Sequence, residues 1–181
     1  MVIKKKMIII IIISLVSMLL LALRVSGNNE VETSPEEYLE LQNAARADVG
    51  VPPLKWDVNI EKRARETADR LVQDCLNGEA DQWVPPMYGV NAAWNMGDPH
   101  FTGIDAVKGW VADKHYYDYV TNSCIDGKDC DCYTQMVWRE SSHVGCARAC
   151  CKKGCTIVVC LYDPPGNFPD ERPYLLHYYI I

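Results

Sequence analysis

Nine cysteines in a chain of 181 residues constrain its fold more than any other feature of the sequence. All of them follow an N-terminal stretch built like a secretory signal, with three lysines at 4–6 and an apolar run from Met7 to Leu23. Small residues at 25–27 come next and predict cleavage after Gly27. Cysteines exported to an oxidising compartment pair with one another, so we expect a disulfide framework. The odd count leaves at least one cysteine outside it.

The alternative for the apolar run is a retained anchor, because its length approaches the roughly 20 residues that span a bilayer. With cleavage, the chain divides into a signal peptide at 1–27, a flexible N-terminus at 28–33, one folded domain at 34–174 and a C-terminal extension at 175–181. The signal removes four of the 18 basic residues and none of the 24 acidic ones, so the mature net charge is about −10. That charge argues against nucleic acids and anionic lipid headgroups as partners.

Residues that cap helices open three segments, at Ser34, at Asp57 and at Thr102. Apolar residues at helical spacing follow each of them. We therefore expect four helices: 34–50, 57–75, one that begins at 102 and a short one around 134–139.

Two strands are expected near the C-terminus, at 143–149 and 156–162. The second is apolar on both faces, which predicts a central position in a sheet. Residues 77–103 contain many glycines and prolines and are expected to form an extended loop with one short strand. Helices around a short, mostly antiparallel sheet predict an α+β fold in layers.

Two motifs resemble the signatures of the CAP superfamily of cysteine-rich secretory proteins, antigen 5 and pathogenesis-related protein 1. They are Cys130–Arg139, which reads CDCYTQMVWR, and Cys160–Asn167, which reads CLYDPPGN. The segment 51–57, VPPLKWD, is similar to the plant pathogenesis-related members. The resemblance implies a three-layer α-β-α sandwich stapled by disulfides. It also implies a defence-related, secreted protein in the apoplast, with the vacuole as the alternative.

Six cysteines fall at the spacing of that family, and sequence alone does not choose their pairing. They are Cys75, Cys124, Cys130, Cys146, Cys151 and Cys160. The three others are Cys132, Cys150 and Cys155. We expect Cys150 to pair with Cys155, which leaves Cys132 as a free thiol on a monomer, with a disulfide-linked dimer through Cys132 as the alternative.

Family members carry two histidines and two glutamates in a cleft, a set that suits a divalent metal. The corresponding positions here are Glu79, Val90, Asp113 and Cys132. One interpretation is a new metal or thiol site that uses Asp113 and Cys132 with Glu79 or His100. The other is a degenerate site with no zinc or other cofactor, which we favour because no ligand pair has a recognised metal spacing.

Catalysis has little support in the sequence. Ser141, Ser142 and His143 are adjacent, but adjacency is not the geometry of a catalytic triad, and no Gly-x-Ser-x-Gly elbow occurs. We therefore expect a protein that is not an enzyme, and a metal- or thiol-dependent hydrolase is kept as a third hypothesis.

An aromatic cluster lies where some family members carry a sterol-binding loop. Its residues are Trp110, Tyr116, Tyr117 and Tyr119. We expect them to bind a sterol or another apolar small molecule, so that membrane contact occurs only through an extracted lipid. The alternative is that these rings pack the core.

The tail carries the last family feature. Plant relatives release a defence-signalling peptide after a Cys-Asn-Tyr-Asp sequence, and here Cys160–Asp163 precedes Pro164–Tyr174. The alternative function is therefore a precursor of a signalling peptide, or a receptor ligand that acts through its C-terminal region.

Overall fold

The computed structural model describes residues 32–77, 87–125, 127–150 and 154–175. They form four helices, a 3-10 turn and six strands. The helices are α2 (Pro35–Asp48), α3 (Val58–Asn77), α4 (Gly103–Ala112) and α5 (Asp131–Met136), and the turn is η1 (Asp113–Tyr116). The strands are β1 (Lys55–Trp56), β2 (Gly89–Met96), β3 (Tyr117–Asp118), β4 (Ser123–Cys124), β5 (His143–Cys150) and β6 (Cys155–Asp163). None of the described helices is long and apolar enough to cross a bilayer.

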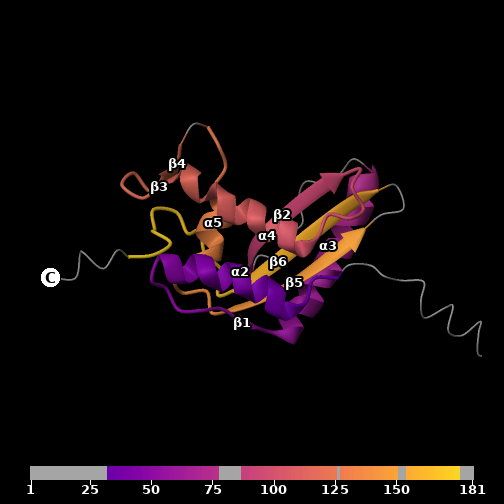
Figure 1. Cartoon of the computed structure of the whole chain (residues 1–181), viewed down its shortest axis with the longest axis horizontal. Coiled ribbons are helices and arrows are strands. Elements are labelled where there is room, and N and C mark those ends of the chain that lie inside the picture. The colour runs from indigo at the N-terminus through magenta and orange to yellow at the C-terminus, as the bar shows by residue number, and fades with distance from the viewer. Residues whose placement is uncertain (1–31, 78–86, 126, 151–153, 176–181) are drawn as a thin grey trace, which may run out of the picture. The chain divides into compact units, whose positions relative to one another are not determined.

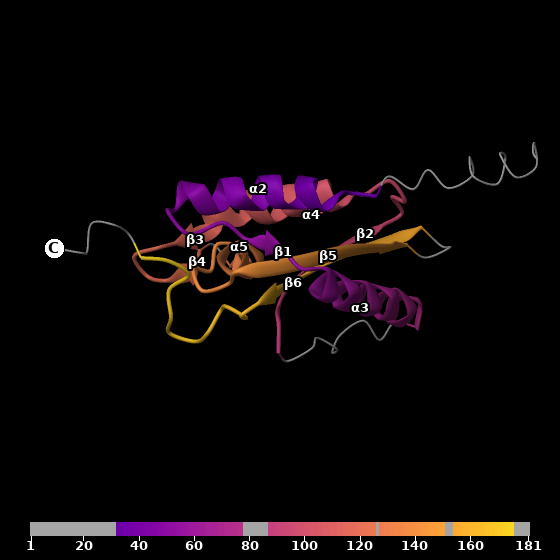
Figure 2. The same cartoon turned by 90° about the horizontal axis from the view of Figure 1, so that it is seen from below.

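The main sheet has the strand order β1-β5-β6-β2 (Figure 1). β6 pairs antiparallel with β5 and with β2, and the short β1 pairs parallel with β5. Helices α2 and α4 cover one face of this sheet and α3 covers the other (Figure 2). The expected α+β fold in three layers is therefore confirmed. The prediction of a central position for β6 is confirmed too, since all of its residues but the last are buried.

The predicted helix starts are present. The Ser34 side chain accepts a hydrogen bond from the backbone N–H of Glu37, whose carboxylate accepts one from the Ser34 N–H. The same reciprocal pair joins Thr102 and Asp105 at the start of α4. Asp57 accepts hydrogen bonds from two backbone N–H groups in the first turn of α3. Such caps satisfy N–H groups that have no partner within the helix, and they depend only on local sequence.

The two faces of the sheet carry different cores. The side chains of Ile157, Val159 and Leu161 pack against the apolar side of α3. The side chains of Val158, Cys160 and Tyr162 point the other way, toward α2, α4 and α5. Successive residues of a strand face opposite sides, so these two sets alternate along β6.

Disulfide bonds join Cys124 to Cys130 and Cys146 to Cys160. The ladder places Cys150 opposite Thr156, whereas Cys155 lies next to Thr156 and faces α3. Cys150 and Cys155 therefore point to opposite faces of the sheet, and the structure does not form the predicted bond between them. The side chain of Cys75 and all of Cys151 lie outside the described residues.

Local details differ from the expectations. The one short strand expected within 77–103 is present as β2, but it is eight residues long and pairs with β6 along its whole length. The hairpin of β3 and β4 was not expected. Thr33, placed in a flexible N-terminus, is buried, and its hydroxyl accepts a hydrogen bond from the Gly103 N–H. The signal peptide and the last six residues lie outside the described part of the chain.

Candidate functional site

A cleft of about 210 Å³ lies between the β3–β4 hairpin, α5 and the segment after β6. We call it the terminal cleft. Its walls combine aromatic rings, carboxylates and amides, from Tyr117, Asn122, Ser123, Cys124, Cys130, Asp131, Thr134, Trp138, Asn167, Phe168, Pro169, Asp170, Glu171 and Pro173.

Helix α5 positions one wall of the cleft. The hydroxyl of Thr134 donates to the side-chain oxygen of Asn167 at 2.8 Å, and the Asn167 amide donates to the carbonyl oxygen of Asp131. The side-chain oxygen of Gln135 accepts a hydrogen bond from the Gly166 N–H at 2.8 Å. These contacts join the two family motifs, one on α5 and one after β6.

The segment 164–174 forms the opposite wall and is tied down along its length. The backbone N–H of Arg139 donates to the carbonyl oxygen of Pro173 at 2.7 Å. The guanidinium of Arg172 donates to the carbonyl oxygens of Tyr119 and Val120 in the hairpin. Its carbon also lies 4.7 Å from the centre of the Tyr119 ring, a cation–π distance. The tail, whose release as a peptide was the alternative function, is therefore hydrogen-bonded to the rest of the domain.

Four tyrosines form a cluster beside the cleft. The ring centre of Tyr117 lies 6.2 Å from that of Tyr133 and 6.3 Å from that of Tyr174, and Tyr119 stacks on Tyr174 at 5.3 Å. Burial raises the pKa of Tyr117 to about 12. The Tyr117 phenol is therefore neutral at physiological pH and presents an apolar ring with a hydroxyl tip.

The four residues predicted to bind an apolar ligand do not line one cleft. Trp110 is 4% exposed and packs inside the core. Tyr116 turns toward His115, with 3.8 Å between the ring centres. Of the four, Tyr117 is the one that lines the terminal cleft, and Tyr119 reaches it through the tyrosine cluster.

The positions of the family's metal set are also separated. Val90 packs on the α3 face of the sheet, while Cys132 packs against the core on the other face. Glu79 lies outside the described residues. His100 lies in the loop before α4 and is exposed. Of these positions, Asp113 is the one whose charge acts on the pKa of the Cys132 thiol.

The environment of Cys132 opposes a thiolate. Burial raises the pKa of its thiol to about 12, and the carboxylates of Asp129 and Asp113 act in the same direction. Burial and the Asp129 carboxylate also raise the pKa of Asp113. A metal-binding thiol must be deprotonated, so this donor set does not fit the metal that the family implies.

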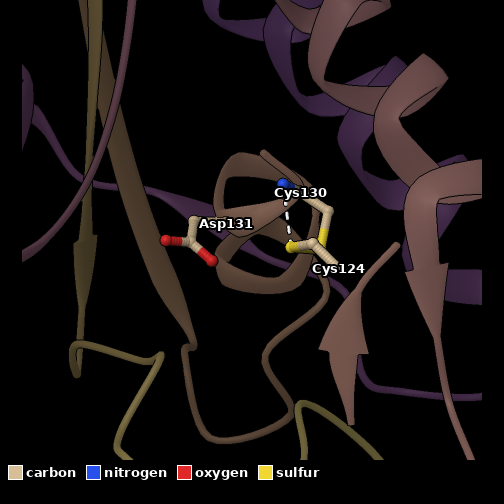
Figure 3. Close-up of side chains that lie close together, drawn as sticks. All are labelled: Cys124, Cys130 and Asp131. Carbon is tan, nitrogen blue, oxygen red and sulfur yellow. Dashed lines mark hydrogen bonds between the residues drawn. A yellow bond between two sulfur atoms is a disulfide. The ribbon is translucent and has the colours of Figure 1, made fainter. Parts of the chain in front are cut away.

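Within the described chain, three potential metal ligands come within 4.8 Å of one another only at Cys124, Cys130 and Asp131 (Figure 3). The two sulfurs are bonded to each other, and the Cys130 N–H donates to the Cys124 sulfur at 3.0 Å. A disulfide supplies no thiolate, so this group does not constitute a metal site.

A second cleft, of about 330 Å³, lies between the start of α2, α3 and β5. The rings of Tyr38 and Trp56 stack in its wall at 5.7 Å. Its rim is charged, because Glu32, Glu61 and Arg65 line it. No motif in the sequence indicated this cleft, because its walls come from segments far apart along the chain.

Comparisons with known proteins place this architecture in a family. The family model described as "CAP: Cysteine-rich secretory protein family" matches residues 39–162. The chain belongs to this family. It is 45% identical to pathogenesis-related protein 1A of Nicotiana tabacum over 160 residues, which cover 88% of this chain and 92% of that protein. It is 43% identical to pathogenesis-related leaf protein 4 of Solanum lycopersicum over 89% of this chain and 96% of that protein.

The fold of this CAP protein also matches solved structures. The venom allergen-like protein 4 of Schistosoma mansoni aligns with a TM-score of 0.61 at 26% identity. The alignment covers 80% of this chain and 96% of that one. The layered fold and the CAP resemblance predicted from the two motifs are therefore confirmed.

Sequence analysis missed most of the terminal cleft. The motifs include Asp131, Thr134 and Asn167, but the hairpin and the 168–173 stretch carry no comparable signal. Their place beside α5 depends on hydrogen bonds between segments more than 30 residues apart.

Proposed function

We propose that this CAP protein is a secreted, non-catalytic defence protein that binds a sterol or a similar apolar molecule at the terminal cleft. The observation that carries the proposal is the aromatic wall of that cleft. Tyr117, Trp138 and Phe168 line it, and the tyrosine cluster supports Tyr117 from behind. Flat rings with polar groups at the rim suit a molecule that has an apolar body and one hydroxyl.

The volume of the cleft and the exposed apolar side chains beside it determine how such a ligand would bind. Enclosed small-molecule pockets usually measure roughly 300–1,000 Å³, so a 210 Å³ cleft would hold only part of a sterol. The remainder would lie over apolar side chains exposed on the same segments. These are Val120, Ile125, Phe168 and Leu175. The second cleft is larger and has two aromatic rings in its wall, and charged residues line both clefts, so the second cleft is the alternative location that the titration has to distinguish.

Sterol titration of the purified protein tests the proposal. We expect saturable binding that Tyr117→Ala weakens roughly tenfold, which corresponds to about 1.4 kcal/mol. Tyr116→Ala is the matched control, because Tyr116 faces His115 outside the cleft. Equal losses for both variants, or no binding to the wild-type protein, would reject this location.

Chelator addition separates this proposal from a metal-dependent one. The raised thiol pKa of Cys132 and the position of Val90 on the α3 face of the sheet predict binding that a chelator leaves unchanged. Loss of binding on chelation, restored by zinc and removed by Cys132→Ser, would return the metal site to consideration.

A specific observation favours a second candidate, a precursor of a signalling peptide. Strand β6 ends at Asp163, and the residues from Pro164 onward form a separate extended segment attached by side-chain and backbone hydrogen bonds. If this role holds, a protein truncated after Asp163 would no longer activate defence signalling through a receptor. Full defence signalling by the truncated protein would reject it.

Secretion is part of the first proposal and is tested at the N-terminus. We expect the protein recovered from the apoplast to begin at Asn28. Recovery of an intact Met1 would indicate a retained anchor, and accumulation in the vacuole would indicate the alternative destination.

A further inference from the structure

The outer edge of β5 opens into the second cleft at Cys146. Strand β1 is only two residues long, and its last residue, Trp56, pairs with Val144. Cys146 lies two residues further along β5, opposite Cys160, with 4.0 Å between the two Cα atoms. Such a short distance marks an antiparallel pair that exchanges no backbone hydrogen bonds, so the N–H and C=O of Cys146 point away from β6. The wall of the cleft therefore offers a backbone donor and a backbone acceptor.

This open stretch of the sheet edge is short. On one side of Cys146, the Val144 carbonyl oxygen accepts a hydrogen bond from the Asp57 N–H at 3.0 Å. On the other side, the Arg148 carbonyl oxygen accepts one from the Arg65 guanidinium at 3.3 Å. A peptide that adds a strand to a sheet pairs with several successive groups along the edge. The edge at Cys146 therefore suits single polar groups of a ligand, such as hydroxyls, better than an extended peptide.

An indole ring that is held by two neighbours forms the apolar part of the cleft. The Trp56 ring is half-buried and stacks on Tyr38, with 5.7 Å between the ring centres and 26° between the ring planes. Its Nε1 donates a hydrogen bond to the Glu61 carboxylate at 2.8 Å. Tyr38 is itself only 3% exposed and packs in the core. Trp56 therefore presents a fixed apolar surface, and a ligand that stacks on it orders little that was mobile before.

The charged groups around Trp56 balance one another. Glu61 and Arg65 are four residues apart in α3, so they lie on the same side of the helix. Arg65 forms an ion pair with Glu32, and the Arg148 guanidinium donates to carbonyl oxygens in the loop before α4. The lining thus contains two carboxylates and two guanidinium groups, which gives a formal charge of zero. A neutral ligand with several hydroxyl groups fits this lining better than an ion.

We propose that the second cleft binds a neutral sugar residue of an oligosaccharide. The C–H groups on one face of a sugar ring form an apolar surface that stacks on the Trp56 ring. Sugar hydroxyls both donate and accept hydrogen bonds, so they match the N–H and C=O of Cys146 and the Glu61 carboxylate. The volume of about 330 Å³ lies within the range of roughly 300–1,000 Å³ that is usual for small-molecule sites. This inference does not depend on the terminal cleft or on its ligand.

A sterol satisfies the polar groups of the second cleft less well. It carries one hydroxyl, whereas the N–H and C=O of Cys146 and the Glu61 carboxylate each lose water when a ligand covers them. Burying a polar group without a hydrogen bond is unfavourable. We therefore expect a saccharide and a sterol at different clefts, and variants in each cleft separate the two.

Isothermal titration calorimetry of the purified, oxidised protein tests the inference. Laminaritriose and chitotriose serve as neutral probes, and trigalacturonate serves as an acidic probe of similar size. We expect saturable binding of at least one neutral trisaccharide. Trigalacturonate should bind more weakly, because the chain is acidic and the guanidinium groups of Arg65 and Arg148 already have partners.

Variants assign the binding to the cleft. Trp56→Ala should weaken binding of the neutral trisaccharide roughly tenfold. Trp94→Ala is its matched control, because Trp94 is 47% exposed on β2 and does not line the cleft. Glu61→Ala should weaken binding several-fold, whereas Glu66→Ala, which removes an exposed carboxylate of α3 outside the cleft, should not. Circular dichroism shows whether each variant is folded, and Glu61→Ala carries the test if Trp56→Ala does not fold.

Several outcomes would overturn the inference. They are no binding of either neutral trisaccharide, tighter binding of trigalacturonate, and equal losses in Trp56→Ala and Trp94→Ala. Loss of sterol binding in Trp56→Ala would assign the second cleft to the sterol and would overturn it as well. Saccharide binding that Tyr117→Ala leaves unchanged, together with sterol binding that Tyr117→Ala weakens, would support two separate sites.

Discussion

The two faces of the central sheet are built from different chemistry. The α3 face is almost entirely apolar, with Ala64, Ala68 and Ile157 fully buried. The opposite face buries a polar network in which the Tyr162 hydroxyl donates to Gln42 and accepts a hydrogen bond from Asn91. Arg46, 1% exposed, lies on the same side and donates to four backbone carbonyl groups.

Both faces stabilise the fold, but the polar face also fixes the directions of particular chain segments. Apolar packing is tolerant of direction, because it depends mainly on area and volume. Hydrogen bonds from a buried guanidinium fix the directions of the chain segments that they join. The polar face therefore holds the loop after α5, and with it the terminal cleft, while the apolar face holds the layers together.

The largest expected effect is at Arg46. Burial lowers its pKa to about 10, so it remains charged at neutral pH. Arg46→Met would remove the guanidinium donors of the Met136 and Ser141 carbonyl groups and leave the Trp138 carbonyl with the Ser141 N–H alone. We expect a loss of roughly 3–5 kcal/mol in the free energy of unfolding, measured with urea. A loss below about 1 kcal/mol would mean that the network adds little to stability.

Gly145 tests the apolar face. A Cβ at this position would lie 2.0 Å from the backbone nitrogen of Glu61, where α3 approaches β5. Gly145→Ala should cost about 1–3 kcal/mol, because backbone atoms cannot move aside without separating the layers.

Gly109 is the matched control for Gly145. It lies in α4, and a Cβ there would meet nothing within 4 Å. Gly109→Ala should stabilise the protein by roughly 0.5–1 kcal/mol through helix propensity. Equal effects of the two substitutions on the melting temperature would contradict the close approach of α3 to β5.

Alkaline pH should reduce the contribution that protonated side chains on the polar face make to stability. Burial raises the pKa of Tyr117 to about 12 from its ordinary value of 10.0, and that of the Cys132 thiol to about 12 from 9.0. The folded state therefore keeps protons that the unfolded state releases. The stability from these groups is complete below about pH 9 and is lost as pH rises toward 12.

Urea unfolding at a series of pH values between about 7 and 11 measures this loss of stability. Alkylation followed residue by residue gives a second readout, in which Cys132 of the folded protein should react far more slowly than in the unfolded chain. Equal alkylation rates in both states would show that the thiol is not protected. Slow reaction would also disfavour the predicted dimer through Cys132, which non-reducing electrophoresis tests directly.

The smallest expected effect is at Arg172. Arg172→Gln removes the cation–π contact with Tyr119 and the charged donor to the hairpin. We expect the free energy of unfolding to fall by about 1 kcal/mol or less, because the contact is partly exposed to solvent. Hydrogen exchange should nevertheless accelerate in 164–174 and leave β5 and β6 unchanged. Uniform acceleration would show that this segment is no less stable than the sheet.

The sequence predicted the fold more completely than the site. Helix starts at Ser34, Asp57 and Thr102 were read correctly because a cap is a contact between residues two or three positions apart. The strands β5 and β6 followed from apolar composition and turn residues. Strand β2 was underestimated because five of its eight residues are polar or small, and pairing with β6 outweighs that composition.

Site residues were harder to place because the order of polar and apolar residues along a strand does not indicate which face of the sheet each one occupies. Val90 and Asn91 are neighbours, yet Val90 packs toward α3 and Asn91 donates to the carbonyl oxygen of Cys132. Trp110, grouped by sequence with the tyrosines after α4, turns into the core instead. A shift of one residue in register would exchange these roles.

The sequence by itself determined the family, the helix starts, the central strand and the supply of cysteines, since each depends on local hydrogen bonds, periodicity or composition. Tertiary structure alone decided that Cys150 and Cys155 face apart, that 168–173 closes a cleft against α5, and that the Ser142 N–H meets the Asp163 carbonyl oxygen. Those arrangements depend on strand register and on contacts between distant segments. These contacts contribute to stability only after the helices have packed on the sheet, so local sequence does not indicate them.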